Sequence, residues 1–239
     1  MSITVVGSVA FDTVETPAGR NDEGLGGAAT FFSLAASNFA PVNLVGVVGE
    51  DFPDRHVALF ESKGINIEGL ERAPGRTFRW TGRYHENMND RDTIETQLNV
   101  FEHFHPKLPE TAKDSPFLFL GNIHPSLQLE VLEQAHPRFT GLDTMNLWID
   151  IALDDSEVAL LTGETNLVKG AREIKMLGPR IVDVKKGEHG CVLFSETGIF
   201  SAPGYPLEEV VDPTGAGDTF AGGFIGHLAK SEKPDDAAL

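Results

Sequence analysis

The chain has 239 residues and a formal net charge of −17 at pH 7, because its 36 Asp and Glu residues outnumber its 19 Lys and Arg residues. This length suits one sizeable hydrophobic core with a small lid. An acidic chain without dense basic patches argues against nucleic acid as a partner, and no apolar run approaches the roughly 20 residues of a membrane span. The single cysteine, Cys191, permits no internal disulfide, and the N-terminus lacks the basic flank of a signal peptide, so we expect a cytoplasmic protein.

Strands and helices alternate along the chain. We expect strands near 3–9, 43–48, 117–121, 139–143, 146–151, 180–185 and 190–194, and helices near 27–39, 53–63, 126–135, 156–162, 166–177 and 215–230. Strands such as 117–120 are apolar on both faces, as in a parallel sheet covered by helices. The alternation predicts a single α/β domain over 1–239, with a doubly wound, mostly parallel sheet and helices on both faces. In such sheets, ligands bind beyond the carboxyl ends of the strands.

One segment, at about residues 76–101, departs from this alternation. Parts of 77–84 and 94–101 alternate apolar and polar residues with a period of two, and the polar turn 87–90 joins them. This pattern is typical of a β-hairpin with one solvated face. We interpret it as a small β lid; an excursion without function is the alternative. A lid can exclude water from the site that it covers.

The last predicted helix begins with Gly215, Ala216, Gly217 and Asp218. First-turn N–H groups lack partners inside a helix and, with the helix dipole, attract an anion such as phosphate. The small residues let a ligand approach this backbone closely. An acid there would repel phosphate, so we interpret Asp218 as a base that takes a proton from a hydroxyl attacking the phosphate. The simpler interpretation is an ordinary acid in a first helical turn.

Four stretches carry a family resemblance. The run 212–224, Asp-Pro-Thr-Gly-Ala-Gly-Asp-Thr-Phe-Ala-Gly-Gly-Phe, resembles the C-terminal signature of the ribokinase-like (PfkB) carbohydrate and nucleoside kinases. Residues 26–30 with 45–51 resemble the N-terminal signature of that family. Residues 4–12 resemble its first strand and substrate-binding acid, and 185–190 resemble its nucleotide-side turn. The resemblance covers most of the chain.

This resemblance implies an ATP-dependent kinase that transfers the γ-phosphoryl group to a hydroxyl of a sugar. It implies that Asp218 is the catalytic base and that the anion hole is formed by Gly215, Ala216 and Gly217. The substrate-binding residues would be Asp12, Gly26, Gly27 and Thr30, and the nucleotide-side residues Lys185, Gly187 and Gly190. Glu157 would organise Mg²⁺ through water, and Asp212 and Thr214 would flank a monovalent cation such as K⁺. A lid of this kind also implies a homodimer.

The chain departs from the family pattern in two respects. Thr30 stands where the family generally has an asparagine, which opens the alternative of a nucleoside acceptor. A βα unit near 153–156 and the C-terminal helices are absent from this sequence, and we expect omitted residues rather than a true deletion, since parallel strands need their crossovers. A third hypothesis, of another class, is a catalytically silent sensor that binds a sugar or nucleotide.

Overall fold

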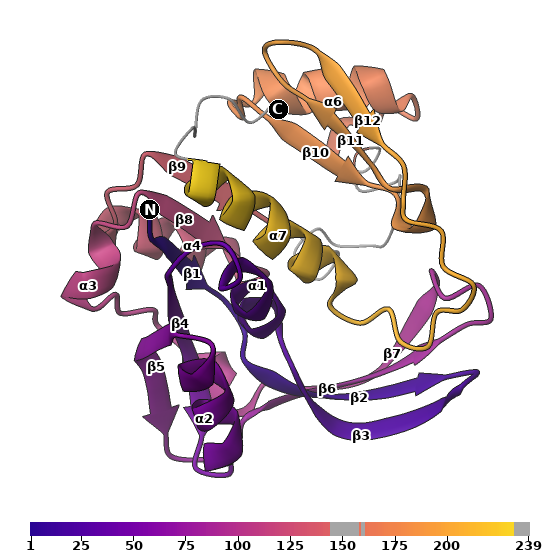
Figure 1. Ribbon diagram of the computed structural model, residues 1–239. Helices are drawn as coiled ribbons and strands as arrows, with labels where there is room; N and C mark the ends of the chain where they lie inside the picture. The colour runs from indigo at the N-terminus through magenta and orange to yellow at the C-terminus, as the bar shows by residue number, and fades with distance from the viewer. Residues whose placement is uncertain (144–157, 159–160, 232–239) are drawn as a thin grey trace. The chain divides into compact units, whose positions relative to one another are not determined.

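The computed structural model describes residues 1–143, 158 and 161–231 (Figure 1). Residues 1–143 with 210–234 form one compact unit, called unit 1 here, and residues 144–209 with 235–239 form unit 2. Among the described residues, unit 1 contains two β-sheets and unit 2 contains one. The expected strand at 146–151, the apparent gap near 153–156, most of the helix at 156–162 and Glu157 lie outside the described residues.

The centre of unit 1 is a five-stranded sheet in the order β5-β4-β1-β8-β9. Its strands are β1 (Ile3–Val6), β4 (Val42–Gly49), β5 (Ile65–Ala73), β8 (Phe117–Leu120) and β9 (Phe139–Leu142). All neighbouring strands are parallel, which confirms the expected doubly wound α/β fold. The chain extends the sheet from β1 to one side and then to the other, so the switch point lies beyond the carboxyl ends of β1 and β8.

Helices cover both faces of this sheet. The helices of unit 1 are α1 (Ala28–Ala36), α2 (Asp54–Ser62), α3 (Glu110–Lys113), α4 (Pro125–Gln134) and α7 (Ala216–Ser231), with the 3₁₀ segment η1 (Asn99–His103). On one face, Phe32 of α1 stacks on Phe119 of β8 at 4.2 Å between ring centroids. Ile225 of α7 packs against Gly141 of β9 on the same face.

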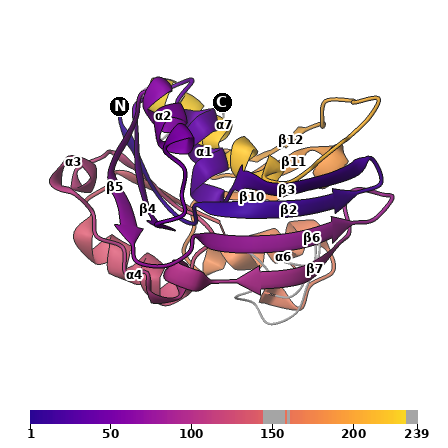
Figure 2. The ribbon, with the colours of Figure 1, turned by 90° about the horizontal axis from the view of Figure 1, so that it is seen from below.

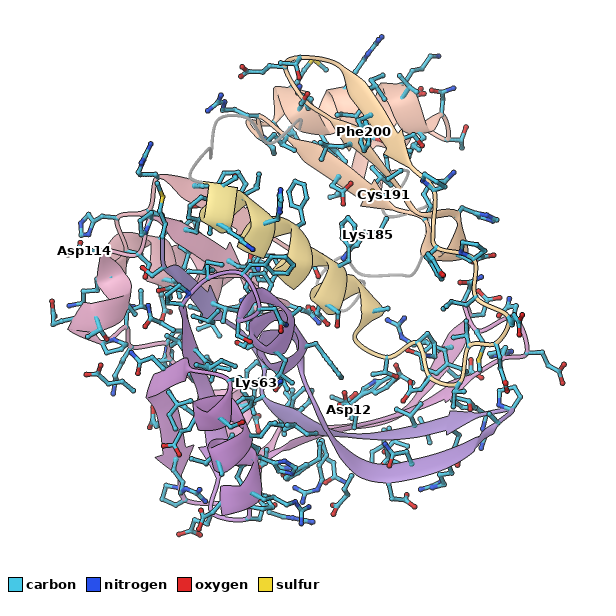
Figure 3. All side chains as sticks on the ribbon, in the orientation of Figure 1. Asp12, Lys63, Asp114, Lys185, Cys191 and Phe200 are labelled. Carbon is cyan, nitrogen blue, oxygen red and sulfur yellow. The ribbon has the colours of Figure 1, made fainter. Side chains whose placement is uncertain are left out.

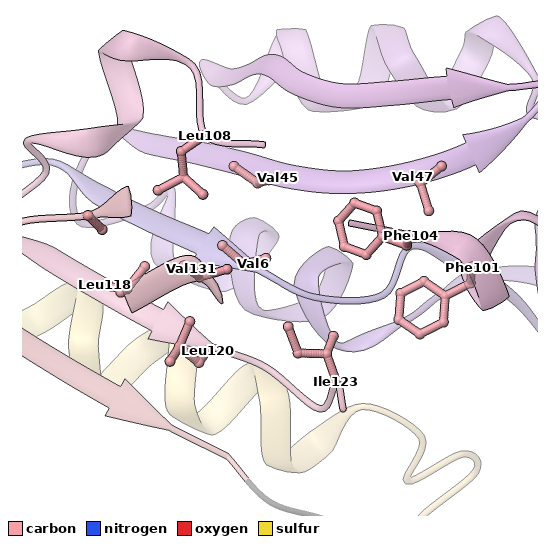
Figure 4. Close-up of a cluster of buried hydrophobic side chains, with 11 residues drawn as sticks. Val6, Val45, Val47, Phe101, Phe104, Leu108, Leu118, Leu120, Ile123 and Val131 are labelled. Carbon is pink, nitrogen blue, oxygen red and sulfur yellow. The ribbon is translucent and has the colours of Figure 1, made fainter. Parts of the chain in front are cut away.

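The other face is closed by a cluster of buried apolar side chains (Figure 4). Val6 of β1 and Leu120 of β8 contribute to it from the sheet, while Val131 of α4 and Phe101 of η1 cover them. Successive residues of a strand point to opposite faces, so strands apolar throughout are buried on both sides. The helix at 215–230, expected from its apolar spacing, is confirmed as α7.

A second sheet in unit 1 has four strands in the order β3-β2-β6-β7 (Figure 2). These are β2 (Ala10–Thr16), β3 (Gly19–Gly26), β6 (Phe78–Tyr84) and β7 (Arg91–Gln97). The expected hairpin is present as β6 and β7, which pair antiparallel, and Asn87 holds its turn by accepting the N–H groups of Asn89 and Asp90. The sequence analysis missed β2 and β3. We call these four strands the lid sheet.

Unit 2 contains a three-stranded antiparallel sheet and one described long helix. Its elements are α6 (Leu167–Met176), β10 (Val182–Lys185), the 3₁₀ turn η2 (Gly187–His189), β11 (Cys191–Phe194) and β12 (Ile199–Ala202). The strands at 180–185 and 190–194 are thus confirmed, but they do not extend the parallel sheet. Their short connection cannot make a parallel crossover. Within the described part of the chain, no helix is both long and apolar enough to span a bilayer.

Candidate active site

The two helices α1 and α7 begin side by side (Figure 1). The contacts between the two helices advance from the N-terminal to the C-terminal end of each. Gly215 contacts Phe31, Gly222 contacts Phe32 and Ala35, and Gly226 contacts Ala36 and Phe39. The contacts at Gly222 are so close that a Cβ there would lie 2.4 Å from the Phe32 carbonyl oxygen. Because the pairs ascend together, the helices run parallel, and their positive dipole ends share one end of unit 1.

The first turn of α1 holds Asp12 of β2. The Gly27 N–H donates to the Asp12 carboxylate, and a Cβ on Gly26 would lie 2.0 Å from Asp12 Oδ2. Gly26 therefore admits no side chain while Asp12 keeps its position. Gly27 has φ +97°, a backbone conformation that favours glycine. The sequence analysis expected Asp12 just after the first strand, whereas it lies within a lid strand (Figure 3).

Burial sets the protonation of Asp12. The residue is only 9% exposed, and desolvation raises the pKa of its carboxyl group from 3.8 to about 7. The Gly27 hydrogen bond opposes this rise, while the charge of Asp212 adds to it. A carboxyl group that titrates near neutral pH, in a unit with a second acid at a helix start, is typical of a functional site.

Ser8, which the sequence analysis overlooked, completes the α1 terminus. Its Oγ accepts the Ala28 N–H at 3.0 Å, and its carbonyl oxygen accepts the Ala29 N–H at 3.0 Å. With Gly27 bound to Asp12, three N–H groups at the start of α1 are engaged. A serine directly after an apolar strand and 20 residues before a helix start is too common a pattern to have signalled this role.

The start of α7 is different, because part of its backbone stays available. Gly215 has φ +73°, and its carbonyl oxygen accepts the Thr219 N–H at 2.8 Å. The Ala216 N–H donates to the Pro213 carbonyl at 3.1 Å. Among the described residues, no hydrogen bond takes up the N–H of Gly215 or Gly217. These two donors, three and one residues before the half-buried Asp218, suit an anion at a helix N-terminus.

The loop before α7 reaches the lid sheet. Asp212 accepts the Thr214 N–H at 2.9 Å, and Thr214 Oγ1 donates to the Tyr84 hydroxyl oxygen at 3.4 Å. Tyr84 lies at the end of β6 and is buried. The loop therefore lies near Asp12 on one side and a lid tyrosine on the other. Among the described residues, no group of three His, Cys, Asp or Glu side chains is placed to hold a metal ion.

The register of the lid sheet places Trp80 beside Asp12. Asp12 of β2 pairs with Trp80 of β6, so both side chains point to the same face as Gly82 and Tyr84. The Trp80 indole lies over Gly82, where a Cβ would be 2.0 Å from the ring, and its Nε1 donates to Thr93 Oγ1 at 3.3 Å. The face that carries Asp12 is thus also aromatic.

The expected nucleotide-side residues lie together in unit 2. Lys185 ends β10, and Gly187 and Gly190 bound the η2 turn, which the Lys186 N–H closes on the Gly190 carbonyl at 2.7 Å. Gly190 has φ +87°, and a Cβ there would lie 2.0 Å from the Ala202 carbonyl oxygen. The tight turn itself therefore requires glycine at this position.

Cys191 and Asp183 share one face of the unit 2 sheet. Burial raises the pKa of the Asp183 carboxyl group, and a hydrogen bond to the Cys191 thiol opposes the rise. Burial and the Asp183 charge raise the pKa of Cys191 to about 11. A thiol with this pKa is protonated at neutral pH and is a poor nucleophile. The bond to Cys191 satisfies only part of Asp183, whose Oδ1 is buried without a hydrogen-bond partner among the described residues.

Comparison with known proteins finds kinases among the relatives of this chain. The family model described as pfkB family carbohydrate kinase matches residues 148–239. The chain is 28% identical over 246 residues to a cytidine kinase of Thermococcus kodakarensis, which covers 94% of this chain and 87% of that protein. The structure of a ribokinase from Thermotoga maritima matches with a TM-score of 0.73 at 21% identity, over 100% of this chain and 89% of that one.

Residues 148–239 thus match the pfkB family model, and the relatives that the chain resembles over most of its length are kinases. The kinase relatives indicate a phosphotransferase with an alcohol group as acceptor. A further relative, an inositol 3-kinase of Arabidopsis thaliana, is 26% identical over 99% of this chain and 70% of its own length. The names of these relatives refer to different acceptors. The acceptor of this chain must therefore be inferred from its own site.

Unit 1 brings together most of the expected site residues. Gly26, Gly27 and Asp12 meet at the start of α1, and Asp218 follows the glycines at the start of α7. Thr30 is fully buried, and its Oγ1 has no hydrogen-bond partner among the described residues. The neighbouring Phe31, which the sequence analysis did not select, contacts Gly215 instead.

Proposed function

We propose that this protein is an ATP-dependent kinase that transfers the γ-phosphoryl group to a hydroxyl of a sugar, with Asp218 as the catalytic base. The observation that carries the proposal is the pairing of two helix starts in one unit. One start holds the buried carboxyl group of Asp12, and the other offers the free donors of Gly215 and Gly217 beside Asp218. Phosphoryl transfer depends mainly on such positioning and on stabilisation of charge.

The roles follow from the chemistry of each group. Asp218 accepts the proton of the attacking hydroxyl, and the α7 backbone from Gly215 to Gly217 stabilises the charge of the transferring phosphoryl group. An ionised Asp12 accepts hydrogen bonds from two acceptor hydroxyls, since a carboxylate has several lone-pair sites. Gly26 and Gly27 leave room for this carboxylate.

The cofactor assignments rest on the family and on residue type. In this proposal Mg²⁺, with Glu157 as its organiser, would neutralise phosphate charge when bound. Lys185, Gly187 and Gly190 lie on the nucleotide side, where a lysine contacts a phosphate as a point charge. K⁺ would lie at the loop with Asp212 and Thr214, where the Thr214–Tyr84 contact joins that loop to the lid sheet.

The lid sheet is assigned two tasks in this proposal. Its inner face, with Asp12 and Trp80, covers the acceptor and excludes water during transfer. Its edge strands β3 and β7 leave backbone groups unpaired, and Ile94 of β7 is 53% exposed, so the lid also provides the surface of a homodimer. The reaction is expected in the cytoplasm.

A nucleoside acceptor is the second candidate. Trp80 and Tyr84 share the face of Asp12, and aromatic rings at this place can stack on a base. The similarity to a cytidine kinase extends over 94% of the chain, in line with this candidate. A nucleoside presents both a hydroxymethyl group and a flat base, whereas a free sugar presents only the former.

The test is ADP release with ribose, fructose or cytidine as acceptor, followed by the variant Asp218→Asn. Loss of a general base typically costs about 10²–10⁴ in rate, so turnover should nearly vanish while ATP binding persists. Asp54→Asn is the matched control, because Asp54 is also a first-turn acid but its side chain is 99% exposed. If Asp218→Asn keeps more than about a tenth of wild-type turnover, the role assigned to a general base is wrong. ATP binding without turnover of any acceptor would favour the silent sensor.

A further inference from the structure

Phe31 differs from the neighbouring residues of α1 in the exposure of its side chain and in its contact with α7. It lies in the first turn of α1, where Thr30 and Phe32 are fully buried and Phe31 itself is half-buried. A Cβ on Gly215 would lie 2.3–2.5 Å from three carbon atoms of the Phe31 ring. The ring therefore rests on the Gly215 Cα, next to the backbone donors at the start of α7.

Phe31 is also tied to the acid of the acceptor site. Its N–H donates to the Gly27 carbonyl at 3.2 Å, and the Gly27 N–H donates to the Asp12 carboxylate. One helical turn thus carries a carboxylate contact at its start and an aromatic ring at its end. The ring contacts Gly215, and the backbone of its residue is bonded to the glycine that holds Asp12.

We propose that Phe31 is a specificity-determining residue of the acceptor site, whose ring takes the C–H face of a ring-shaped acceptor while Asp12 takes its hydroxyl edge. This inference rests on the proposed function. Sugars and nucleosides have such a split character, with C–H groups on one face of the ring and hydroxyls along its edge. An aromatic face beside a carboxylate matches both parts, because it buries the apolar face without leaving a polar group unpaired.

The burial of the neighbours supports Phe31 rather than Thr30. The Thr30 hydroxyl has no exposed surface and lies in the interior, so it presents no group to a ligand in this structure. The helix turns by about 100° per residue, which carries the next side chain from the interior to the α7 side. Phe31 is therefore the α1 side chain at this level that contacts the start of α7.

The test compares Phe31→Leu and Phe31→Met, which keep an apolar side chain without a ring, with Phe31→Tyr, which keeps the ring. Ribose, cytidine and myo-inositol are the acceptors. For each acceptor that the wild type phosphorylates, the Leu and Met variants should raise the acceptor KM about tenfold, as stacking is lost. Both kcat and the KM for ATP should change less than about twofold, and Phe31→Tyr should stay near the wild type. Phe39→Leu is the control, because Phe39 also packs on α7, at Gly226.

Each other result overturns the inference. A lower kcat with an unchanged acceptor KM would mean that Phe31 acts through the position of Gly215. If the Leu and Met variants have a lower melting temperature but unchanged kinetics, Phe31 only packs α1 against α7 and does not contact the acceptor. If Phe31→Leu does not fold, Phe31→Met carries the same comparison. A wild type that phosphorylates none of these three acceptors and not fructose overturns the proposed function as well, whereas an active wild type with unchanged acceptor KM in the variants overturns this inference alone.

Discussion

Replacing Asp12 by asparagine should stabilise the free protein, and more so at higher pH. Burial raises the pKa of this carboxyl group from 3.8 to about 7, so folding favours its neutral form. A raised pKa gives stability that is full below pH 3.8 and is lost as pH rises toward 7. Asparagine keeps an oxygen for the Gly27 N–H but carries no charge, so the variant does not lose this stability.

The size of the effect follows from the shift. The difference between about 7 and 3.8 is about 3 pH units, and each unit corresponds to about 1.4 kcal/mol. By linkage, the wild type has lost about 2 kcal/mol at pH 5.5 and about 4 kcal/mol at pH 8. The advantage of Asp12→Asn should therefore widen by about 2 kcal/mol between these two pH values.

Urea unfolding of both proteins at pH 5.5 and pH 8, without acceptor, measures this difference. Asp114→Asn serves as the control for the change in net charge, because its side chain is 90% exposed. The variant should at the same time lose acceptor binding, since a neutral amide accepts fewer hydroxyl hydrogen bonds than a carboxylate. A stability difference that is the same at both pH values would refute the assignment of a desolvated acid at Asp12.

Two further substitutions test the start of α7 and the interior of α1. Gly215→Ala should destabilise the protein by at least about 1–2 kcal/mol, because the residue has φ +73° and its Cβ would strike the Phe31 ring. Urea unfolding and kcat measure this, and an active variant of wild-type stability would contradict the contact. Thr30→Val should raise the free energy of unfolding by about 1 kcal/mol, since it removes a buried hydroxyl without a partner. The acceptor KM should not change in this variant. A change of more than about threefold would indicate that Thr30 contacts the acceptor after all.

The sequence by itself predicted the parallel sheet and the start of the last helix. Strands such as β8 are apolar throughout, and a run of this kind is stable only between two layers of helices. The Gly215–Asp218 run marked the helix start because small residues and free N–H groups are local properties. The resemblance to kinases that transfer phosphate to an alcohol was likewise predicted from this run and its flanking residues.

The tertiary structure alone decided how the lid is built. The pairing of Asp12 with Trp80 joins residues that are far apart in the sequence, and no local pattern encodes such a partner. Strand β3 is largely exposed and polar, so it lacks the alternation that reveals a half-buried strand. The sequence therefore predicted the hairpin of β6 and β7 but not the two further strands, β2 and β3, that complete the lid sheet.

The same holds for the acceptor side of the site. Whether Thr30 or Phe31 contacts the start of α7 depends on the rotation of α1, which packing against both β8 and α7 determines. The raised pKa of Asp12 depends on its burial in the fold and on the charge of Asp212 in the loop before α7. Residue types and short motifs determined which chemistry this chain performs, because they act through local backbone geometry. Packing between distant segments decided which side chains meet the acceptor, because burial and contact are sums over the whole fold.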